Sequence, residues 1–462
     1  MLDRLQAAVA AAHGYTELRQ HANTATRVVL RQGAVIANTI EHVAGVSARC
    51  HGNGGFGFSA EPNASDDAIA RVMAEARSNA ELAARHAAHS NQALPITEPG
   101  RGIWEHHSAN AALPPQARID LLRRLDAGLR ARHRDLANVD LALQELAIDK
   151  ALATTEGALT FTHSPRTVLY AALEYRSSDG TPTRIADVFG GFGGFEDHEE
   201  SFGSAETEAT LDRLYDELRR KADGVFCEAG MHDVVLDADI AGILAHEAIG
   251  HTCEGDLVLG GSVAGPALGQ VVASDKITLM DQAGLGMDGG AAVAVHVDDE
   301  GTPCRDVTII DRGVLRGFLH NKDTALELGM TPTGNARAYA YSDEPLVRMR
   351  NTCILPGDDK LDDMIGAIDR GYYFTRSGNG QADFTGEFMF AVTSGYEIRG
   401  GKLARAIRDT TISGIAFDML KAVTHVGDRF VWSPGGWCGK KQLIPVTMGG
   451  AALKTRINVG GR

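Results

Sequence analysis

The sequence of 462 residues contains few cysteines and aromatic residues and has no excess of positive charge. Its six cysteines are scattered, a density too low for a disulfide framework, so we expect reduced thiols and a cytoplasmic location. The net charge of −15 argues against broad binding to nucleic acid or anionic membranes, because such binding needs a basic surface. We therefore expect neither a direct nucleic-acid partner nor a membrane partner.

Long apolar runs are also missing. No stretch of about 18 apolar residues occurs, so no membrane-spanning helix is predicted. Charged residues interrupt the apolar positions of residues 1–20, which therefore resemble an amphipathic helix more than the apolar core of a signal peptide. Hydrophobic residues make up 44% of the chain, enough for a large core without disulfides.

The chain is long enough for about two to four domains, and its patterns predict three units. Residues 1–90 have the alternating strands and glycine-rich turns of a small α/β unit, and residues 89–104 resemble a linker. Residues 112–225 form a second unit with helical and strand-like segments. Residues 226–462 are rich in strand patterns around one apolar helix at 241–251. The predicted fold class is α+β, with N-terminal α/β units before a strand-rich C-terminal domain that carries one buried helix.

The sharpest chemical signal is HEAIGH, which contains His246, Glu247 and His251. Imidazoles are common zinc ligands, and the familiar zinc-peptidase motif places two histidines four residues apart on one helical face. Here they are five apart, which on a regular α-helix leaves the side chains ~140° apart instead of ~40°. The helix must therefore widen into a π-bulge or end before His251, and Gly250 offers the backbone freedom for either.

Catalytic zinc usually takes a third protein ligand besides water. The glycines of GGWCGKK would expose a thiol, and Lys440 and Lys441 would favour its thiolate form, which binds metal. Residues just after the helix could also reach the ion. The residue types leave four candidates open: Cys253, Glu254, Asp256 and Cys438.

Several segments resemble the TldD/PmbA peptidase family. GILAHEAIGHTCEGD at 242–256 is similar to the hallmark segment of its members, GVSARCHGNGGFGFSAE at 45–61 to their N-terminal signature, and CGKKQLIPVTMGGAALKTRINVGG at 438–461 to their C-terminal end. The chain has the H-E-x-x-x-H segment that some paralogues lack. The resemblance implies a C-terminal zinc peptidase domain with one Zn²⁺ per chain on His246, His251 and Cys438, and Glu247 as the general base on zinc-bound water.

The resemblance also implies a function. Members of the family cleave unfolded or short peptides, in peptide maturation or degradation, and their catalytic subunit commonly pairs with a motif-lacking paralogue. We therefore expect an unfolded peptide substrate and either a homodimer or such a heterodimer. Three arginines are candidates to hold a substrate carboxylate, although such side chains are more often solvated or paired internally: Arg337, Arg348 and Arg350.

Two alternative functions remain open from the sequence. One is a metal hydrolase that acts on non-peptide amides. The other is a regulatory protein with a structural zinc, acting in a toxin–antitoxin system or in gyrase modulation. A structural zinc normally has four protein ligands, so a fourth ligand from Cys253 or Asp256 would favour this reading.

Overall fold

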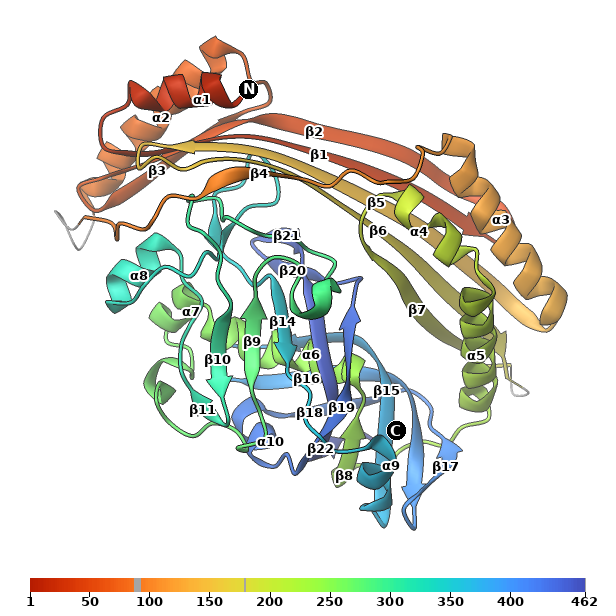
Figure 1. Ribbon diagram of the computed structural model, residues 1–462. Helices are drawn as coiled ribbons and strands as arrows, with labels where there is room; N and C mark the ends of the chain where they lie inside the picture. Colours follow the sequence, from red (N-terminus) through yellow and green to blue (C-terminus); the bar gives the residue numbers. More distant parts are fainter. Residues whose placement is uncertain (87–92, 178–179, 462) are drawn as a thin grey trace.

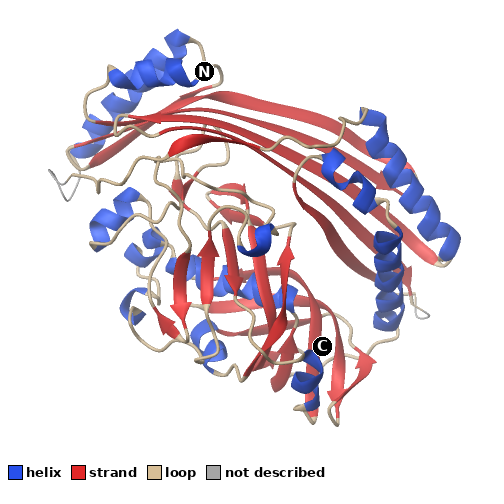
Figure 2. Cartoon of the chain, in the orientation of Figure 1, coloured by secondary structure: helices blue, strands red, loops and turns tan. Residues whose placement is uncertain are grey.

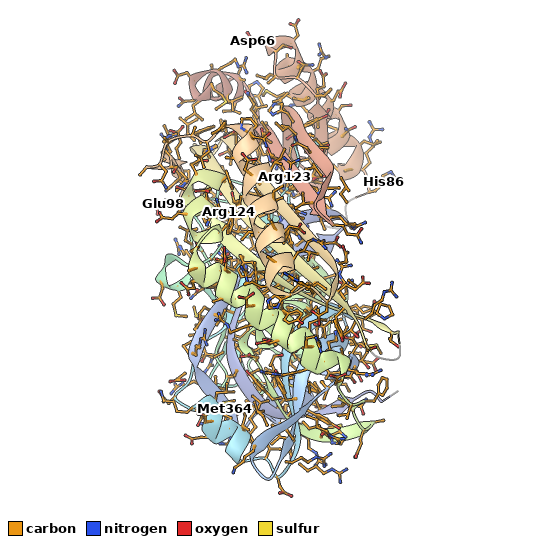
Figure 3. The ribbon with its side chains drawn as sticks, turned by 90° about the vertical axis from the view of Figure 1, so that its right-hand side faces the viewer. Asp66, His86, Glu98, Arg123, Arg124 and Met364 are labelled. Carbon is orange, nitrogen blue, oxygen red and sulfur yellow. The ribbon has the colours of Figure 1, made fainter. Side chains whose placement is uncertain are left out.

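The computed structural model describes residues 1–86, 93–177 and 180–461 and shows an α+β protein built on two large sheets (Figures 1 and 2). The predicted fold class is confirmed, including the strand-rich C-terminal region. No helix among the described residues is long and apolar enough to cross a membrane. In the view turned by 90°, Asp66 of the N-terminal part and Met364 of the C-terminal part mark opposite ends of the molecule (Figure 3).

The N-terminal half forms a seven-stranded sheet in the order β3-β2-β1-β5-β6-β4, with β7 also paired to β6. Residues 1–90 and 112–225 both supply strands to it, so the two predicted units share one sheet. Its strands are β1 Tyr15–Arg31, β2 Ala34–Gly52, β3 Gly55–Glu61, β4 Arg101–Glu105, β5 Leu136–Thr154, β6 Leu159–Arg176 and β7 Pro182–Phe192. Its helices are α1 Leu2–Ala10, α2 Asp66–Ala84, α3 Pro115–Arg132, α4 Phe195–Phe202 and α5 Ala205–Ala222.

Two local predictions need correction. The N-terminal helix ends at Ala10 instead of continuing to residue 20, because residues pair with β2 from Tyr15 onward and with β5 from Glu17 onward. Of the predicted linker 89–104, residues 89–92 lie outside the described part of the chain. Residues 101–104 belong to β4, which pairs in parallel with β6. In both places tertiary strand pairing outweighs the local pattern.

The C-terminal half contains an eleven-stranded sheet. Its strands are β8 Gly230–Leu236, β9 Leu279–Gln282, β10 Val307–Asp311, β11 Val314–Leu315, β14 Asn351–Ile354, β15 Arg370–Ala382, β16 Glu387–Arg399, β17 Lys402–Ala406, β18 Thr410–Ile415, β19 His425–Ser433 and β22 Thr447–Val459. Two small hairpins pair β12 Ala336–Arg337 with β13 Leu346–Val347, and β20 Trp437–Lys440 with β21 Gln442–Pro445. The α-helices are α6 Ala238–Leu244, α7 Gly255–Leu259, α8 Lys322–Leu328, α9 Leu361–Gly366 and α10 Ala416–Lys421.

Helix α6 lies directly on strand β22 at the centre of the largest hydrophobic core. Glycines make this close approach possible: a Cβ atom on Gly450 would lie 2.9 Å from the backbone nitrogen of Gly242. Ile240 and Leu244 are buried in the same core. The apolar sequence of this helix is therefore explained by burial, as predicted for the segment that contains the HEAIGH motif.

The N-terminal sheet arches over the C-terminal unit, and charged side chains join the two (Figure 1). Arg49 of β2 bonds Glu300 at 2.7 Å, and Lys150 of β5 bonds Asp299 at 2.8 Å. Arg19 of β1 donates to the backbone carbonyl of Asp343 at 2.6 Å. These buried contacts join the sheet to the unit below.

Candidate metal centre

The helix that carries the HEAIGH motif changes its winding at the motif. The α-helical part ends at Leu244, a π-helical turn spans Ala245–Gly250, and a 3₁₀ turn follows over His251–Cys253. The wider turn brings two histidines five residues apart toward the same side. The prediction of a local π-widening is confirmed.

Gly250 serves a different purpose from the one predicted. Its φ of −55° and ψ of −50° are ordinary helical angles, so the turn does not need the backbone freedom of glycine. A Cβ atom at this position would instead lie 2.0 Å from Sδ of Met349, which is fully buried. The glycine is therefore required by close packing.

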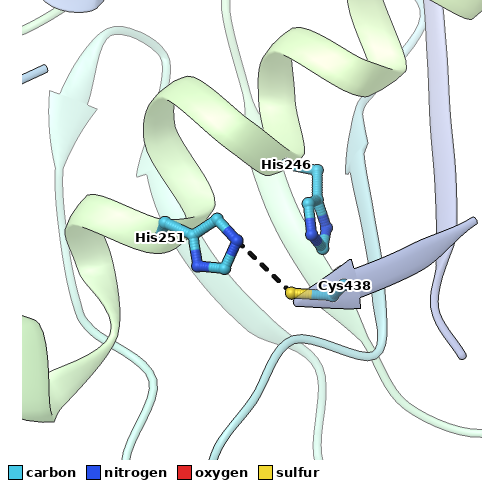
Figure 4. Close-up of side chains that lie close together, drawn as sticks. All are labelled: His246, His251 and Cys438. Carbon is cyan, nitrogen blue, oxygen red and sulfur yellow. Dashed lines mark hydrogen bonds between the residues drawn. The ribbon is translucent and has the colours of Figure 1, made fainter. Parts of the chain in front are cut away.

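Three potential ligand atoms meet at this turn (Figure 4). Those of His246, His251 and Cys438 all lie within 4.8 Å of one another. Nε2 of His251 is 3.3 Å from Sγ of Cys438, although 187 residues separate them. Two tetrahedral ligands of one zinc ion, one nitrogen and one sulfur, would be separated by roughly 3.5 Å. The spacing of the pair fits a shared ion.

The buried polar atoms of His246 also fit a metal. The residue is 0% exposed, and neither of its ring nitrogens has a hydrogen-bond partner among the residues that the structure describes. An unpartnered buried polar group costs free energy, and a metal ion would satisfy one of the two nitrogens. Two imidazoles and a thiol form a donor set suited to zinc.

The sequence suggested that Cys438 lies in an exposed loop, and this prediction is wrong. Cys438 lies on β20 and is 1% exposed. Burial raises the pKa of its thiol, but the imidazoles of His246 and His251 outweigh burial and lower that pKa to about 4. Lys440, which we expected to favour the thiolate, instead bonds the carboxylates of Glu254 and Asp256.

Glu254 orients one of the histidines, a role that sequence analysis missed. The fully buried carboxylate accepts from Nδ1 of His251 at 2.8 Å, which turns Nε2 toward Cys438. Burial raises the pKa of Glu254, but His251 and Lys440 outweigh it and lower that pKa to about 2. A carboxylate that bonds the far nitrogen of a ligand histidine fixes its tautomer and ring orientation. Glu254 follows His251 by three residues, about one helical turn, and this spacing was the signal in the sequence that the two side chains could meet.

The other candidate ligands lie outside the group of three. The thiol of Cys253 is completely buried beside Thr252, and burial raises its pKa to about 12, which disfavours the metal-binding thiolate. Asp256 is engaged with Lys440 at 3.0 Å. Within the described residues, His246, His251 and Cys438 form the only group of three or more side chains that could hold a metal ion.

Glu247 lies beside the group and is partly exposed to solvent. Its Oε2 atom is 3.8 Å from Nε2 of His251, and its side chain is 25% exposed. The side chain of His251 is 18% exposed, whereas His246 is covered completely. The group is therefore approached from the side where Glu247 lies, which suits a residue that exchanges protons with a water molecule.

The three candidate arginines make internal bonds. Arg348 donates to the carbonyls of Cys438 and Gln442, at 2.7 and 2.9 Å, and so clamps the β20–β21 hairpin. Arg350 forms a completely buried ion pair with Asp281 at 2.8 Å. Arg337 donates to the carbonyls of Met349 and Pro445. All three thus make the internal contacts that we weighed against binding of a substrate carboxylate, but within the described residues only Arg350 is paired with a carboxylate.

A carboxylate beside a cluster of imidazole and thiol ligands is typical of metal-dependent hydrolases. Comparison with known proteins agrees with this class. Residues 229–461 match the family model of the PmbA/TldA metallopeptidase C-terminal domain, and residues 16–80 match domain 1. The chain belongs to the PmbA/TldD family of metallopeptidases.

Individual relatives support the family. A metalloprotease of Methanothermobacter thermautotrophicus is 34% identical over 322 residues, which are 69% of this chain and 68% of the relative. A zinc metalloprotease TldD homolog of Saccharolobus solfataricus is 35% identical over 236 residues, about half of each chain (51% and 52%). The fold is similar to the crystal structure of TldE from Thermococcus kodakarensis, with a TM-score of 0.76 and 16% identity over 97% of this chain and 96% of the other.

Proposed function

We propose that the chain is a zinc-dependent peptidase in which His246, His251 and Cys438 hold one zinc ion. The observation that carries this proposal is the pair of unpartnered ring nitrogens on the fully buried His246, beside a thiol with a low pKa. The name of the Saccharolobus relative supports zinc as the metal. A set of three protein ligands supports catalysis over a structural zinc, which normally has four.

In the proposed reaction, the bound zinc supplies a Lewis acid that polarises the scissile carbonyl and makes a water molecule more acidic. Glu247 accepts a proton from the attacking water and passes it to the leaving amine. Glu254 keeps His251 in the tautomer whose Nε2 faces the metal position. Arg348 holds the strand of Cys438 in place by bonding its carbonyl.

Unfolded or short peptides are the substrates that suit this site best. Cys438 and His246 are buried, and only part of Glu247 reaches solvent. A folded domain would have to expose its scissile bond beyond its own surface to reach Glu247, whereas an extended chain presents each bond in turn. We propose that the active species is a dimer, either of two identical chains or with a motif-lacking paralogue.

The test is incubation of the zinc-loaded protein with one domain in folded and unfolded forms, with products identified by mass spectrometry. We expect cleavage of the unfolded form, loss of activity after zinc is removed by a chelator, and recovery when zinc is returned. Light scattering gives the mass of the active species. Efficient cutting of the folded form by a monomer would contradict both the substrate and the assembly proposals.

A further inference from the structure

A cavity lies between the N-terminal sheet and the C-terminal unit, and the peptidase mechanism does not use it. One wall is the face of strands β5 and β6. The other wall is formed by residues 292–299, together with Arg337 and Pro445. Three cross-strand pairs build the sheet wall: Leu146 with Arg166, Ile148 with Ser164, and Lys150 with Thr162.

Two buried arginines in the cavity wall have no carboxylate partner in the part of the chain that the structure describes. Arg166 is 5% exposed, donates to the backbone carbonyls of Pro434 and Gly436, and has an unpartnered Nε. Arg337 is equally buried and donates to the backbone carbonyls of Met349 and Pro445. Among the described residues, neither guanidinium has an ion pair. Burial lowers the pKa of Arg166 to about 10. Burial and the neighbouring Arg348 lower the pKa of Arg337 to about 10, against the opposing effect of Asp281 and Asp299.

The remaining charges around the cavity do not neutralise these arginines. Lys150 is bound to Asp299 at 2.8 Å. The carboxylate of Asp298 accepts backbone N–H groups of Glu300, Thr302 and Ala336. The cavity wall thus carries three cationic side chains and at most two anionic ones. Buried charge without a counter-charge is costly, so the site is suited to an anion.

We propose that this cavity binds the C-terminal residue of a peptide, with its carboxylate on Arg166 and Arg337 and its apolar side chain against Leu146, Ile148 and Val293. The planar fork of a guanidinium matches a carboxylate, and the aliphatic wall favours an apolar last residue. This inference rests on the proposed peptidase function and deepens it.

The position of Arg166 favours a peptide over a free acid. Its guanidinium bonds Pro434 and Gly436, which come directly before the strand that carries Cys438. A chain end held by Arg166 therefore lies against the segment that leads into the metal-binding group. A free short-chain aliphatic acid has the same carboxylate chemistry and is the other possible source of the ligand.

The test uses the zinc-loaded Glu247→Gln protein, which should bind peptides without cutting them. Calorimetry compares an N-acetylated peptide that ends in leucine with the same peptide as its C-terminal amide. We expect the free acid to bind on the order of tenfold more tightly or better, because a charged hydrogen-bond pair is lost in the amide. Equal affinity of acid and amide would overturn the proposal. Isovalerate alone separates the sources: if it binds as tightly as the peptide acid, the peptide assignment is overturned.

Variants locate the carboxylate. In the same protein, Arg166→Gln should remove the preference for the acid, and circular dichroism and zinc content show that the variant is folded. The matched control is Arg408→Gln, because Arg408 also donates to two backbone carbonyls, those of Ala222 and Gly224, outside the cavity. A preference that persists in folded Arg166→Gln would mean that the metal or another site holds the carboxylate, against the proposal.

The comparison of the peptide acid with its amide needs no arginine variant. It therefore tests whether the protein binds a C-terminal carboxylate even if Arg166→Gln fails to fold. Cleavage by the unmodified protein is scored separately. Cleavage without a preference for the acid overturns the cavity assignment alone. A preference without cleavage by the zinc-loaded protein overturns the peptidase proposal and leaves a carboxylate-binding site.

Discussion

Replacing Gly250 by alanine tests why a glycine stands between the two histidines. The backbone angles at this position are helical, so the substitution by itself should stabilise the helix by about 1 kcal/mol. The new Cβ atom, however, would lie 2.0 Å from Sδ of Met349, whereas carbon–sulfur contacts normally need at least ~3.5 Å. The fully buried thioether must therefore move by roughly 1.5 Å.

The expected size of the effect follows from these two opposing contributions. Overpacking of a buried site costs about 1–3 kcal/mol, and a displacement of this size belongs at the upper end. Subtracting the helical gain leaves a net loss of about 2 kcal/mol in the free energy of unfolding. Zinc content should fall as well, because the displaced turn carries His246 and His251.

A double-mutant cycle isolates the contact. Met349→Ala by itself should cost about 2–5 kcal/mol because it empties a buried position. In that background Gly250→Ala no longer meets the sulfur and should stabilise by up to ~1 kcal/mol. Urea denaturation at one pH measures the free energy of unfolding of the unchanged protein, the two single variants and the double variant, each treated with a chelator. The packing argument is refuted if Gly250→Ala has the same effect in both backgrounds, or if it stabilises the otherwise unchanged protein.

Four further predictions test the site and the joint between the N-terminal sheet and the C-terminal unit. Cys438→Ala should lower zinc content measured by mass spectrometry while Cys253→Ala keeps it; equal retention would remove Cys438 from the ligand set. Glu247→Gln should keep zinc but reduce peptide cleavage at least ~100-fold, and undiminished activity would exclude it as the base. Glu254→Gln should weaken zinc binding by about 10- to 100-fold in chelator competition, and unchanged affinity would deny it an orienting role. Glu17 of β1 is buried at the joint, where it pairs with Arg49 at 3.1 Å. Burial raises the pKa of Glu17 to about 7 in the folded state, above its unfolded value of about 4.3, so the stability it contributes should decline as pH rises through this interval. Glu17→Gln should flatten that decline in urea melts; identical pH profiles would show that another group causes it.

The local sequence restricted the winding of the helix that carries HEAIGH to a π-bulge or an end before His251. Because His246 and His251 are five residues apart, a regular α-helix cannot aim both rings at one point, and this constraint holds whatever surrounds the helix. The apolar composition of residues 241–251 likewise predicted burial. The segments that resemble the family were also visible in the sequence, since they are short and continuous.

Contacts between distant segments decided the rest. The thiol of Cys438 lies 3.3 Å from Nε2 of His251 although the two are 187 positions apart, and its strand is held by Arg348 and by pairing with β21. Lys440 seemed placed to activate that thiol, yet the fold directs it to Glu254, and the imidazoles lower the thiol pKa instead. The sharing of one sheet by residues 1–90 and 112–225 depends on hydrogen bonds between β1 and β5. Local patterns define each strand and helix, but only the packed chain determines which of their side chains meet, because those contacts join residues far apart in sequence.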